Sequence, residues 1–384
     1  MSLSVVYLYA SVACVRAANA IFMVSLVLTL PDITPAFHGL ILASYALVEA
    51  LVGVLAGGLY ERFGSRTILS LATLALTLLY LTMSLNPTPY LILLLNALAG
   101  SMASGVLVAS LAVLAEETRG RSVARLFGAG GFEASNLGGY ALGFSIALVL
   151  ELLGILRGFL ASAFLSFLAF IASLLTPEFR GRRLLFVVDR RVLKLAPLWF
   201  GLANLIGLAF TSPKILVETG ISPIIGGIEG GVSLTLITGL LSVSAGLLVG
   251  SYIATVVGKL GALILGSASI SLALVIGGMF IDVILKPIFL PILVLLAIPA
   301  MTLPPAMLAL LADYTDTAKA RGVQMGFYVT ILGLGIASGE FILGGLLFQE
   351  LGLTPMMIVT AILFITLATP TIYLVHLDSK RGNT

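Results

Sequence analysis

Four charged residues, Arg16, Glu49, Glu133 and Glu340, stand out within long apolar stretches of the sequence. Arg16 has Asn19 three residues later, a spacing that puts both side chains on one face of a helix. A guanidinium stays charged and presents a fixed fork of donors, so Arg16 suits the carboxylate or phosphate of a bound solute. The competing interpretation is a structural ion pair between Arg16 and Glu49.

The carboxyl groups in this setting suit the binding of a coupling ion. Glu133 and Asn136 form a second same-face pair within a glycine-rich stretch, where helices pack closely and a carboxylate can exchange protons. Glu340 lies beside Gly339, and hydration near a membrane surface is an alternative explanation for it. We therefore expect a proton, or else a sodium ion, to bind among Glu49, Glu133 and Glu340.

Patterns typical of enzymes and metal sites are not found in the sequence. His38 and His376 stand singly near the ends of apolar stretches, and Cys14 is the one cysteine. No Gly-x-x-x-x-Gly-Lys-Ser/Thr sequence occurs. The sequence therefore predicts no catalytic residues, no metal and no cofactor.

The elements that position these side chains must be membrane helices. Of the 384 residues 60% are hydrophobic and 10% are charged, and the mean hydropathy is +1.18. A helix that crosses roughly 30 Å of hydrocarbon needs about 20 mostly apolar residues, and such stretches follow one another along the chain. Because the stretches are continuous rather than alternating, barrel strands are excluded. The predicted fold class is an all-α polytopic membrane protein in a lipid bilayer.

Twelve transmembrane helices are predicted, six on each side of a polar stretch. The predicted spans are 4–30, 36–59, 67–85, 90–115, 126–150, 159–176, 195–217, 231–257, 262–281, 288–311, 323–348 and 355–376. The predicted domains are a six-helix bundle over 1–178, a cytoplasmic linker over 179–194 and a second six-helix bundle over 195–384. The first apolar stretch superficially resembles a cleavable signal, but it has no basic leader and is interpreted as the first span.

Basic residues predict the orientation of these spans. Most of the 20 Lys and Arg residues fall in loops on one side of the membrane, and the exceptions in loops of the other side are Arg157, Lys214 and Lys286. Since basic loops stay inside, both termini are expected in the cytoplasm, and the protein in the inner (plasma) membrane. This topology explains the net charge of +3 without a nucleic-acid partner.

The two halves repeat short sequences at matching positions. LAVLAEET (111–118) ends the fourth span and LALLADYT (308–315) ends the tenth, while GVLAGG (53–58) in the second span is echoed by GLLVGS (246–251) in the eighth. Parallel six-helix repeats are a known transporter architecture. The halves are therefore expected to be pseudo-symmetric.

A loop between the second and third spans, GGLYERFGSRT, carries a family resemblance. It resembles the signature Gly-x-x-x-Asp-Arg-x-Gly-Arg-Arg/Lys of the major facilitator superfamily of transporters. The matching positions are Gly57, Arg62, Gly64 and Arg66. Glu61 stands in place of the usual aspartate and Ser65 in place of the first of two basic residues. The glycines allow a tight turn with close helix approach, and the acid and bases can pair between helix ends.

The resemblance implies a monomeric carrier whose two halves alternate access to one solute site. In the family this loop latches one conformation, its acid near a later helix end and a base paired to the end of the fourth span. These roles are carried over to Glu61, Arg62, Arg66 and Glu116. The resemblance also favours Asn96 and Asn204 as solute contacts, with interhelical hydrogen bonds as the equal alternative. Two drug-antiporter patterns are incomplete: Asn96 replaces an arginine, and the fifth span has no proline.

Prolines predict a bend in the tenth span, at Pro291, Pro299, Pro304 and Pro305. A bend frees backbone carbonyls, which neighbouring helices or a cavity must satisfy. The bend is therefore interpreted either as part of a cavity-lining gate or as a packing feature.

The predicted function is secondary active transport of a small-molecule substrate by a rocker-switch motion, with an organic anion as the solute and a proton as the coupling ion. Efflux of lipophilic compounds is the alternative, in which Arg16 is already neutralised and Glu49 or Glu133 carries protons. A non-transporting sensor or scaffold is less well supported, because only the loop at 177–194 and a short tail are available to pass on a signal.

Overall fold

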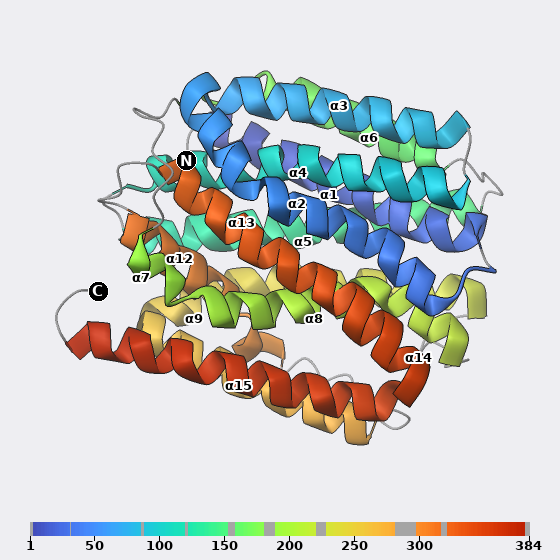
Figure 1. Ribbon diagram of the computed structural model, residues 1–384. Helices are drawn as coiled ribbons and strands as arrows, with labels where there is room; N and C mark the ends of the chain where they lie inside the picture. Colours follow the sequence, from blue (N-terminus) through green and yellow to red (C-terminus); the bar gives the residue numbers. More distant parts are fainter. Residues whose placement is uncertain are drawn as a thin grey trace.

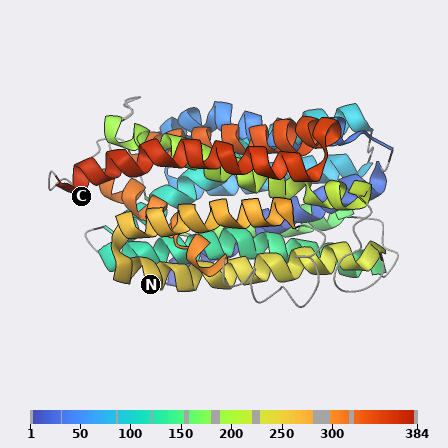
Figure 2. The same cartoon turned by 90° about the horizontal axis from the view of Figure 1, so that it is seen from below.

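The computed structural model shows long helices that run side by side (Figure 1), and Figure 2 shows the same arrangement from below. The structure describes residues 3–30, 32–85, 88–119, 122–152, 158–179, 189–219, 228–280, 297–315 and 321–380. No strand occurs among them. Both chain ends lie at the same end of the molecule, which we call the termini end, and the opposite end is the far end.

The first half of the chain forms six helices. They are α1 (Leu3–Thr29), α2 (Pro35–Phe63), α3 (Ser65–Leu85), α4 (Pro89–Glu117), α5 (Ser122–Leu152) and α6 (Gly158–Ser173). Pro35 and Pro89 begin α2 and α4, where the missing N–H costs nothing, and the Thr34 hydroxyl accepts a hydrogen bond from Phe37 N. The boundaries therefore follow local capping chemistry and agree with the predicted spans.

The second half of the chain is less regular. Its elements are α7 (Arg190–Leu193), α8 (Ala196–Thr219), α9 (Ile228–Met279), α12 (Leu303–Thr315), α13 (Arg321–Ser338), the π-helix η2 (Gly339–Leu347), α14 (Phe348–Leu351) and α15 (Leu353–Lys380). Gly258 divides α9 into two spans because its backbone is not helical, with φ 76° and ψ 164°. With α13, η2 and α14 as one span, the described helices make up the predicted twelve.

Length and composition support a membrane setting. Among the described residues, eight helices are long and apolar enough to cross a bilayer, and the helices at 158–173 and 196–212 are shorter but apolar. Large apolar side chains such as Leu71, Phe164 and Ile362 are exposed on the outside, where lipid would cover them. The protein is a multi-pass membrane protein.

The predicted bend is present in the tenth span. Residues 297–300 are helical, 301–302 form a turn, and α12 begins at Leu303 with Pro304 and Pro305 in its first turn. The Thr302 hydroxyl donates a hydrogen bond of 3.0 Å to the Ala262 carbonyl. This bond joins the bend to the neighbouring helix α9. Pro291 and the first part of this predicted span lie outside the described residues, as do linker residues 180–188.

The two halves meet along α2 and α13, which contact each other at many positions (Figure 1). A Cβ at Gly57 would lie 2.3 Å from the Gly322 carbonyl oxygen, and one at Gly53 would lie 2.6 Å from the Gly326 carbonyl. Small residues let the two backbones touch, as in close pairs of membrane helices. We call this contact, which continues to Gly333 against Ala46, the α2–α13 seam.

Apolar side chains also close the space between the halves toward the termini end. They surround a cavity of only about 20 Å³, and include Leu111, Leu114, Leu308, Leu311 and Met325. These described side chains therefore leave only this small space between the termini end and the centre of the molecule.

Backbone geometry supports the internal repeat. Gly64, after α2, has φ 87° and ψ 168°, and Gly258, at the same place in the second half, has φ 76° and ψ 164°. L-residues rarely adopt such positive φ angles, whereas glycine does so readily. Corresponding spans of the two halves therefore end in the same type of turn.

Candidate functional site

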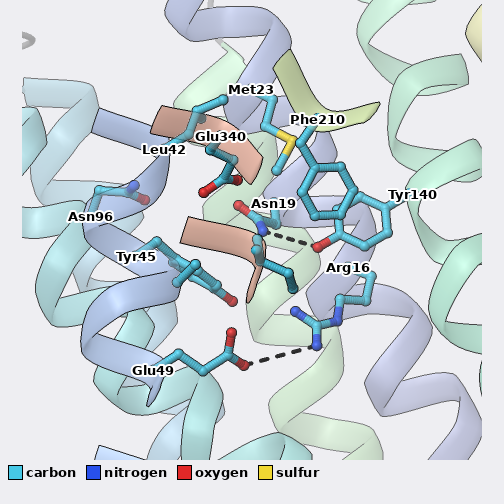
Figure 3. A pocket seen from close by; sticks show the side chains of 12 residues that line it. Arg16, Asn19, Met23, Leu42, Tyr45, Glu49, Asn96, Tyr140, Phe210 and Glu340 are labelled. Atoms are coloured by element: carbon cyan, nitrogen blue, oxygen red, sulfur yellow. Dashed lines mark hydrogen bonds and ion pairs between the residues drawn. The ribbon is translucent and has the colours of Figure 1, made fainter. Parts of the chain in front are cut away.

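A small cavity lies between the two halves and has charged, polar and apolar side chains in its lining (Figure 3). We call it the central cavity. Its volume is about 10 Å³, about enough for one water molecule. Helices of both halves line it with Arg16, Asn19, Met23, Leu42, Tyr45, Ala46, Glu49, Asn96, Tyr140, Phe210, Ile336 and Glu340. Five of the residues predicted as substrate or coupling contacts are in this lining.

Arg16 is held from one side by α5. Its Nε donates a hydrogen bond of 2.6 Å to Asn136 Oδ1, and Asn136 Nδ2 donates to Glu133 Oε2 at 3.2 Å. The guanidinium carbon also lies 5.8 Å from the centre of the Tyr140 ring, within the range of cation–π attraction. The same-face pairs expected on α1 and α5 thus meet through Arg16 and Asn136.

Arg16 and Glu49 form a long ion pair. The distance from Arg16 Nη2 to Glu49 Oε1 is 3.9 Å, too long for a hydrogen bond, and Glu49 Oε1 has no hydrogen-bond partner among the described residues. Both side chains are buried, with 7% of Arg16 and 2% of Glu49 exposed. The terminal amino groups of Arg16 likewise donate no hydrogen bond within the described part of the chain.

Glu340 lies in the π-helical segment η2, and a glycine of α2 and a glycine of α8 pack closely against its backbone. A Cβ at Gly39 of α2 would lie 2.6 Å from the Glu340 carbonyl oxygen, and one at Gly207 of α8 would lie 3.0 Å from Glu340 N. π-Helical turns are rare and often mark functional sites. Glu340 Oε2 is buried and lacks a hydrogen-bond partner among the described residues.

The predicted asparagine contacts differ in position. Asn19 Nδ2 donates to Tyr140 Oη at 3.3 Å. Asn96 Nδ2 donates to the Ile41 carbonyl at 2.7 Å, while Asn96 Oδ1 is buried without a partner in the described structure. Asn204 is not in the cavity lining; its Nδ2 donates to Phe200 O within its own helix, at 2.9 Å.

Charge is not balanced at the centre of the molecule. Among the described residues that line the cavity, Arg16 is the one cation, while Glu49 and Glu340 are carboxyl groups; Glu133 approaches Arg16 through Asn136. Burying an ionised carboxylate without a counter-ion costs several kcal/mol. With all three carboxyl groups ionised, this region would hold more negative than positive charge. Among the described residues no group of three or more His, Cys, Asp or Glu side chains is arranged to hold a metal ion.

The major facilitator superfamily model matches residues 8–303 of the sequence. The chain belongs to this superfamily. Among solved structures, the human organic anion transporter MFSD10 (TETRAN) is similar, with a TM-score of 0.74 and 14% sequence identity over 96% of this chain and 98% of that chain. At this identity the likeness shows the fold. No curated protein matches the sequence.

The superfamily loop motif lies at the termini end, where it joins the halves. Glu61 Oε1 accepts a hydrogen bond of 2.7 Å from Gly322 N, at the first turn of α13. Ser65, the departure from the signature, exchanges hydrogen bonds with Phe179 through N and Oγ, each of 2.9 Å. This serine therefore ties α3 to the residues after α6.

The basic residues of the motif have other neighbours. Arg66 Nε donates to the Thr176 carbonyl at 3.0 Å, and the exposed Arg62 guanidinium lies 5.1 Å from the centre of the Phe63 ring. Glu116 is half-buried at the end of α4. The proposed pairing of a motif base with Glu116 stays a prediction.

The second half has its own ion pairs at the termini end. Lys259, after the Gly258 turn, pairs with Asp313 at the end of α12. In the repeat of LAVLAEET and LALLADYT, Asp313 is in the position of Glu116. Lys194 Nζ lies 2.6 Å from Asp378 Oδ2 of α15. Outside the spans, a hydrogen bond from Arg191 lowers the pKa of Asp189, which caps α7.

Sequence reasoning missed the aromatic and apolar side chains of the cavity. Tyr45 precedes Glu49 by four residues and Tyr140 follows Asn136 by four, so each lies one helical turn from a predicted contact. This spacing could have identified both tyrosines as candidate cavity residues from the sequence. The contributions of Phe210 and Ile336 depend on how the halves pack together, which no local pattern contains.

Proposed function

We propose that this protein is a proton-coupled carrier of a small organic anion that works by alternating access. The proposal rests on how few close polar contacts the Arg16 guanidinium makes among the described residues. Among the residues that the structure describes, this buried guanidinium with five donors makes one hydrogen bond, through Nε, and its Nη2 faces Glu49 across 3.9 Å. A planar carboxylate that entered the cavity would fit the unused donors in a bidentate arrangement.

The same geometry links the anion to a proton. An anion bound to Arg16 takes the place of Glu49 as its counter-ion, and Glu49 would then be a buried carboxylate without a cation. Protonation removes that cost. The proton bound by Glu49 and the anion bound by Arg16 would therefore occupy the protein together, which is the requirement for symport.

The described conformation represents a closed state in this scheme. The cavity of about 10 Å³ is too small for an organic anion, so the halves must separate at one end to admit it. Glycines let the backbones of α2 and α13 touch at the seam, and such a smooth contact suits a rocking motion of one half against the other. We further propose that the termini end faces the cytoplasm of the inner membrane and that the carrier is a monomer.

The transport of organic anions in the name of MFSD10 (TETRAN) is a property of that protein. It is consistent with the proposed role of Arg16, but the proposal does not depend on it. Efflux of lipophilic compounds is the second candidate. It is favoured by the apolar residues of the cavity lining, Met23, Leu42, Phe210 and Ile336, and by Arg16 already having Glu49 as a counter-ion.

The test is solute uptake and counterflow in proteoliposomes with an imposed pH gradient. Small organic anions are compared with lipophilic cations for the wild type, Arg16→Ala and Arg16→Lys. We expect anion uptake driven by the pH gradient, abolished in Arg16→Ala and partly kept in Arg16→Lys. Transport of lipophilic cations alone, or wild-type anion uptake by Arg16→Ala, would contradict the proposal and favour efflux.

A further inference from the structure

Three buried side chains present unsatisfied oxygen atoms in one part of the central cavity. They are Glu340 of η2, Asn96 of α4 and Tyr45 of α2, which are 2%, 1% and 6% exposed. All three line the cavity, and Glu340 Oε2, Asn96 Oδ1 and Tyr45 Oη each lack a hydrogen-bond partner among the described residues. A buried polar atom without a partner is destabilising, so this part of the cavity, which we call the acceptor side, suits a ligand that supplies donors.

The orientation of the Asn96 amide follows from its other hydrogen bond. Asn96 Nδ2 donates to the Ile41 carbonyl oxygen at 2.7 Å, and a carbonyl oxygen can only accept. With the amide turned over, two oxygen atoms would face each other. Asn96 Oδ1 is therefore the atom left without a partner, and like an ionised Glu340 it can only accept a hydrogen bond.

The acceptor side lies apart from Arg16. Figure 3 shows Asn96 and Glu340 on one side of the cavity and Arg16 on the other. Arg16 is the one cation among the described lining residues, and its polar neighbours are Asn136 and Glu49. No described basic side chain pairs with Glu340. Because a buried carboxylate without a counter-ion is costly, the donor that fits the acceptor side should also carry a positive charge.

A primary ammonium group meets both requirements. It carries one positive charge and three N–H donors, which matches the three acceptor atoms, and its hydrogen bond to a carboxylate is charge-assisted. A metal ion fits less well, because among the described residues no group of three or more His, Cys, Asp or Glu side chains is arranged to hold one.

Apolar side chains of the same cavity suit the remainder of such a solute. The rings of Tyr140 and Phe210 lie 4.6 Å apart between their centres, and Met23 and Leu42 also line the cavity. A carbon chain between an ammonium group and a carboxylate would contact these side chains.

We infer that Glu340, Asn96 and Tyr45 bind a primary ammonium group of the solute, so that the preferred cargo is an amino acid rather than a plain carboxylate. For the carboxylate of that cargo the inference rests on the proposed function, in which Arg16 binds it. The ammonium group enters when the halves separate, and it gives Glu340 the counter-ion that the described residues do not supply. A plain carboxylate still binds at Arg16, but more weakly, because it leaves Glu340 without a cation.

Pairs of solutes that differ only in the amino group provide the test. Isothermal titration calorimetry of the purified protein compares glycine, 3-aminopropanoate, 4-aminobutanoate and 5-aminopentanoate with acetate, propanoate, butanoate and pentanoate. In the wild type, the amino member of at least one pair should bind at least about 30-fold more tightly than its parent. The Glu340→Gln variant should lose this advantage and keep the affinity for the parent carboxylate, whereas Glu340→Asp, which keeps the charge, should retain part of it.

Several results would overturn the inference. They are equal affinity within every pair, an amino-group advantage that survives in Glu340→Gln, and loss of both members of a pair in Glu340→Gln. Carboxylate binding that strengthens when sodium chloride replaces choline chloride, and only with Glu340 present, would assign the acceptor side to a sodium ion instead.

Two measurements separate this inference from the proposed function. Wild-type affinity for butanoate in Arg16→Ala would contradict the proposed function whatever happens at Glu340. Butylamine has the ammonium group without the carboxylate and therefore tests the acceptor side alone. If butylamine binds the wild type and not Glu340→Gln while no carboxylate binds, the proposed function fails and the ammonium site stands.

Discussion

Two buried glutamates on one helix, Glu49 and Glu61, have opposite kinds of surroundings. Glu61 Oε1 accepts a short hydrogen bond from the backbone of α13 at 2.7 Å. Glu49, three turns away on α2, has a long ion pair of 3.9 Å with Arg16 and an oxygen without a hydrogen-bond partner among the described residues. One carboxylate fastens the two halves directly to each other, while the other is only loosely held.

This difference indicates two separate roles. Glu61 is placed to hold the two halves together, and Glu49 is placed to take part in binding the transported solute. A hydrogen bond to a backbone N–H is directional, and the N–H cannot rotate away as a side chain can. Such a bond therefore suits a contact between the halves that is either fully formed or fully broken. A long ion pair in a dry cavity is easily exchanged for a better-placed ligand, since the original partners lose little hydrogen-bond energy. We expect changes at Glu49 to alter coupling and changes around Glu61 to alter the conformational equilibrium.

The largest effect is expected from Glu49→Gln. Arg16 then lacks its long ion pair, and because an unpaired buried charge costs about 3–5 kcal/mol, the anion should bind at least about tenfold more tightly. The pH gradient should no longer drive accumulation, whereas anion exchange should continue. Uptake and counterflow in proteoliposomes measure both, and gradient-driven accumulation by Glu49→Gln would show that another group carries the proton.

A smaller effect is expected from Gly57→Ala in the seam. The new Cβ would lie 2.3 Å from the Gly322 carbonyl oxygen, and overpacking of this kind costs about 1–3 kcal/mol. The termini end should therefore open about 5–150-fold more often. Maleimide labelling of Ala115→Cys in a Cys14→Ser background measures the opening.

Gly105→Ala is the matched control for this substitution. Its Cβ would meet only side-chain atoms, the nearest at 3.2 Å in Ile68, which can shift. Equal labelling of both variants would mean that the seam does not hold the termini end closed.

The variant Glu61→Gln should have a weaker effect in the same direction. The amide oxygen still accepts from Gly322 N, but the bond loses its charge assistance, worth about 1 kcal/mol. We expect about fivefold more labelling of Ala115→Cys than in the parent, with anion affinity unchanged. A changed anion affinity with normal labelling would place Glu61 in the cargo site instead.

The smallest effect is expected from Asp189, a half-buried carboxylate outside the spans. The hydrogen bond from Arg191 lowers its pKa, so its contribution to stability is present above the ordinary aspartate pKa of about 3.9 and is lost as the pH falls through the lowered value. A partly exposed surface pair of this kind contributes about 0.2–1 kcal/mol to the free energy of unfolding. Thermal unfolding of Asp189→Asn in detergent should therefore differ slightly from the wild type at pH 7 and converge with it in acid.

The sequence was most informative where a residue's setting depends on its own helix. Hydropathy located the spans because each must cross the bilayer by itself. Arg16 and Glu49 could be expected at similar depth because α1 and α2 run in opposite directions. The motif resemblance placed Glu61 near a later helix end, and the structure puts it at Gly322.

The sequence was least informative where the setting depends on packing between distant segments. The sequence of residues 339–347 predicts an ordinary α-helix, and its composition does not indicate a π-helix. The π-helical hydrogen bonds nevertheless determine the position of Glu340. Arg66 bonds a backbone carbonyl, that of Thr176, and every residue offers such an acceptor. Whether an asparagine such as Asn204 lines the cavity likewise depends on how its helix is rotated within the assembled bundle.

The small volume of the central cavity also has an electrical consequence. Among the described residues, the central cavity has room for about one water molecule. An ion that crosses it would therefore move through part of the membrane voltage without a continuous column of water around it. Moving one elementary charge through 100 mV involves about 2.3 kcal/mol. A monovalent anion that crosses with one proton carries no net charge. The proposed cycle would therefore be electroneutral, and a potassium diffusion potential across the vesicle membrane should leave its rate unchanged.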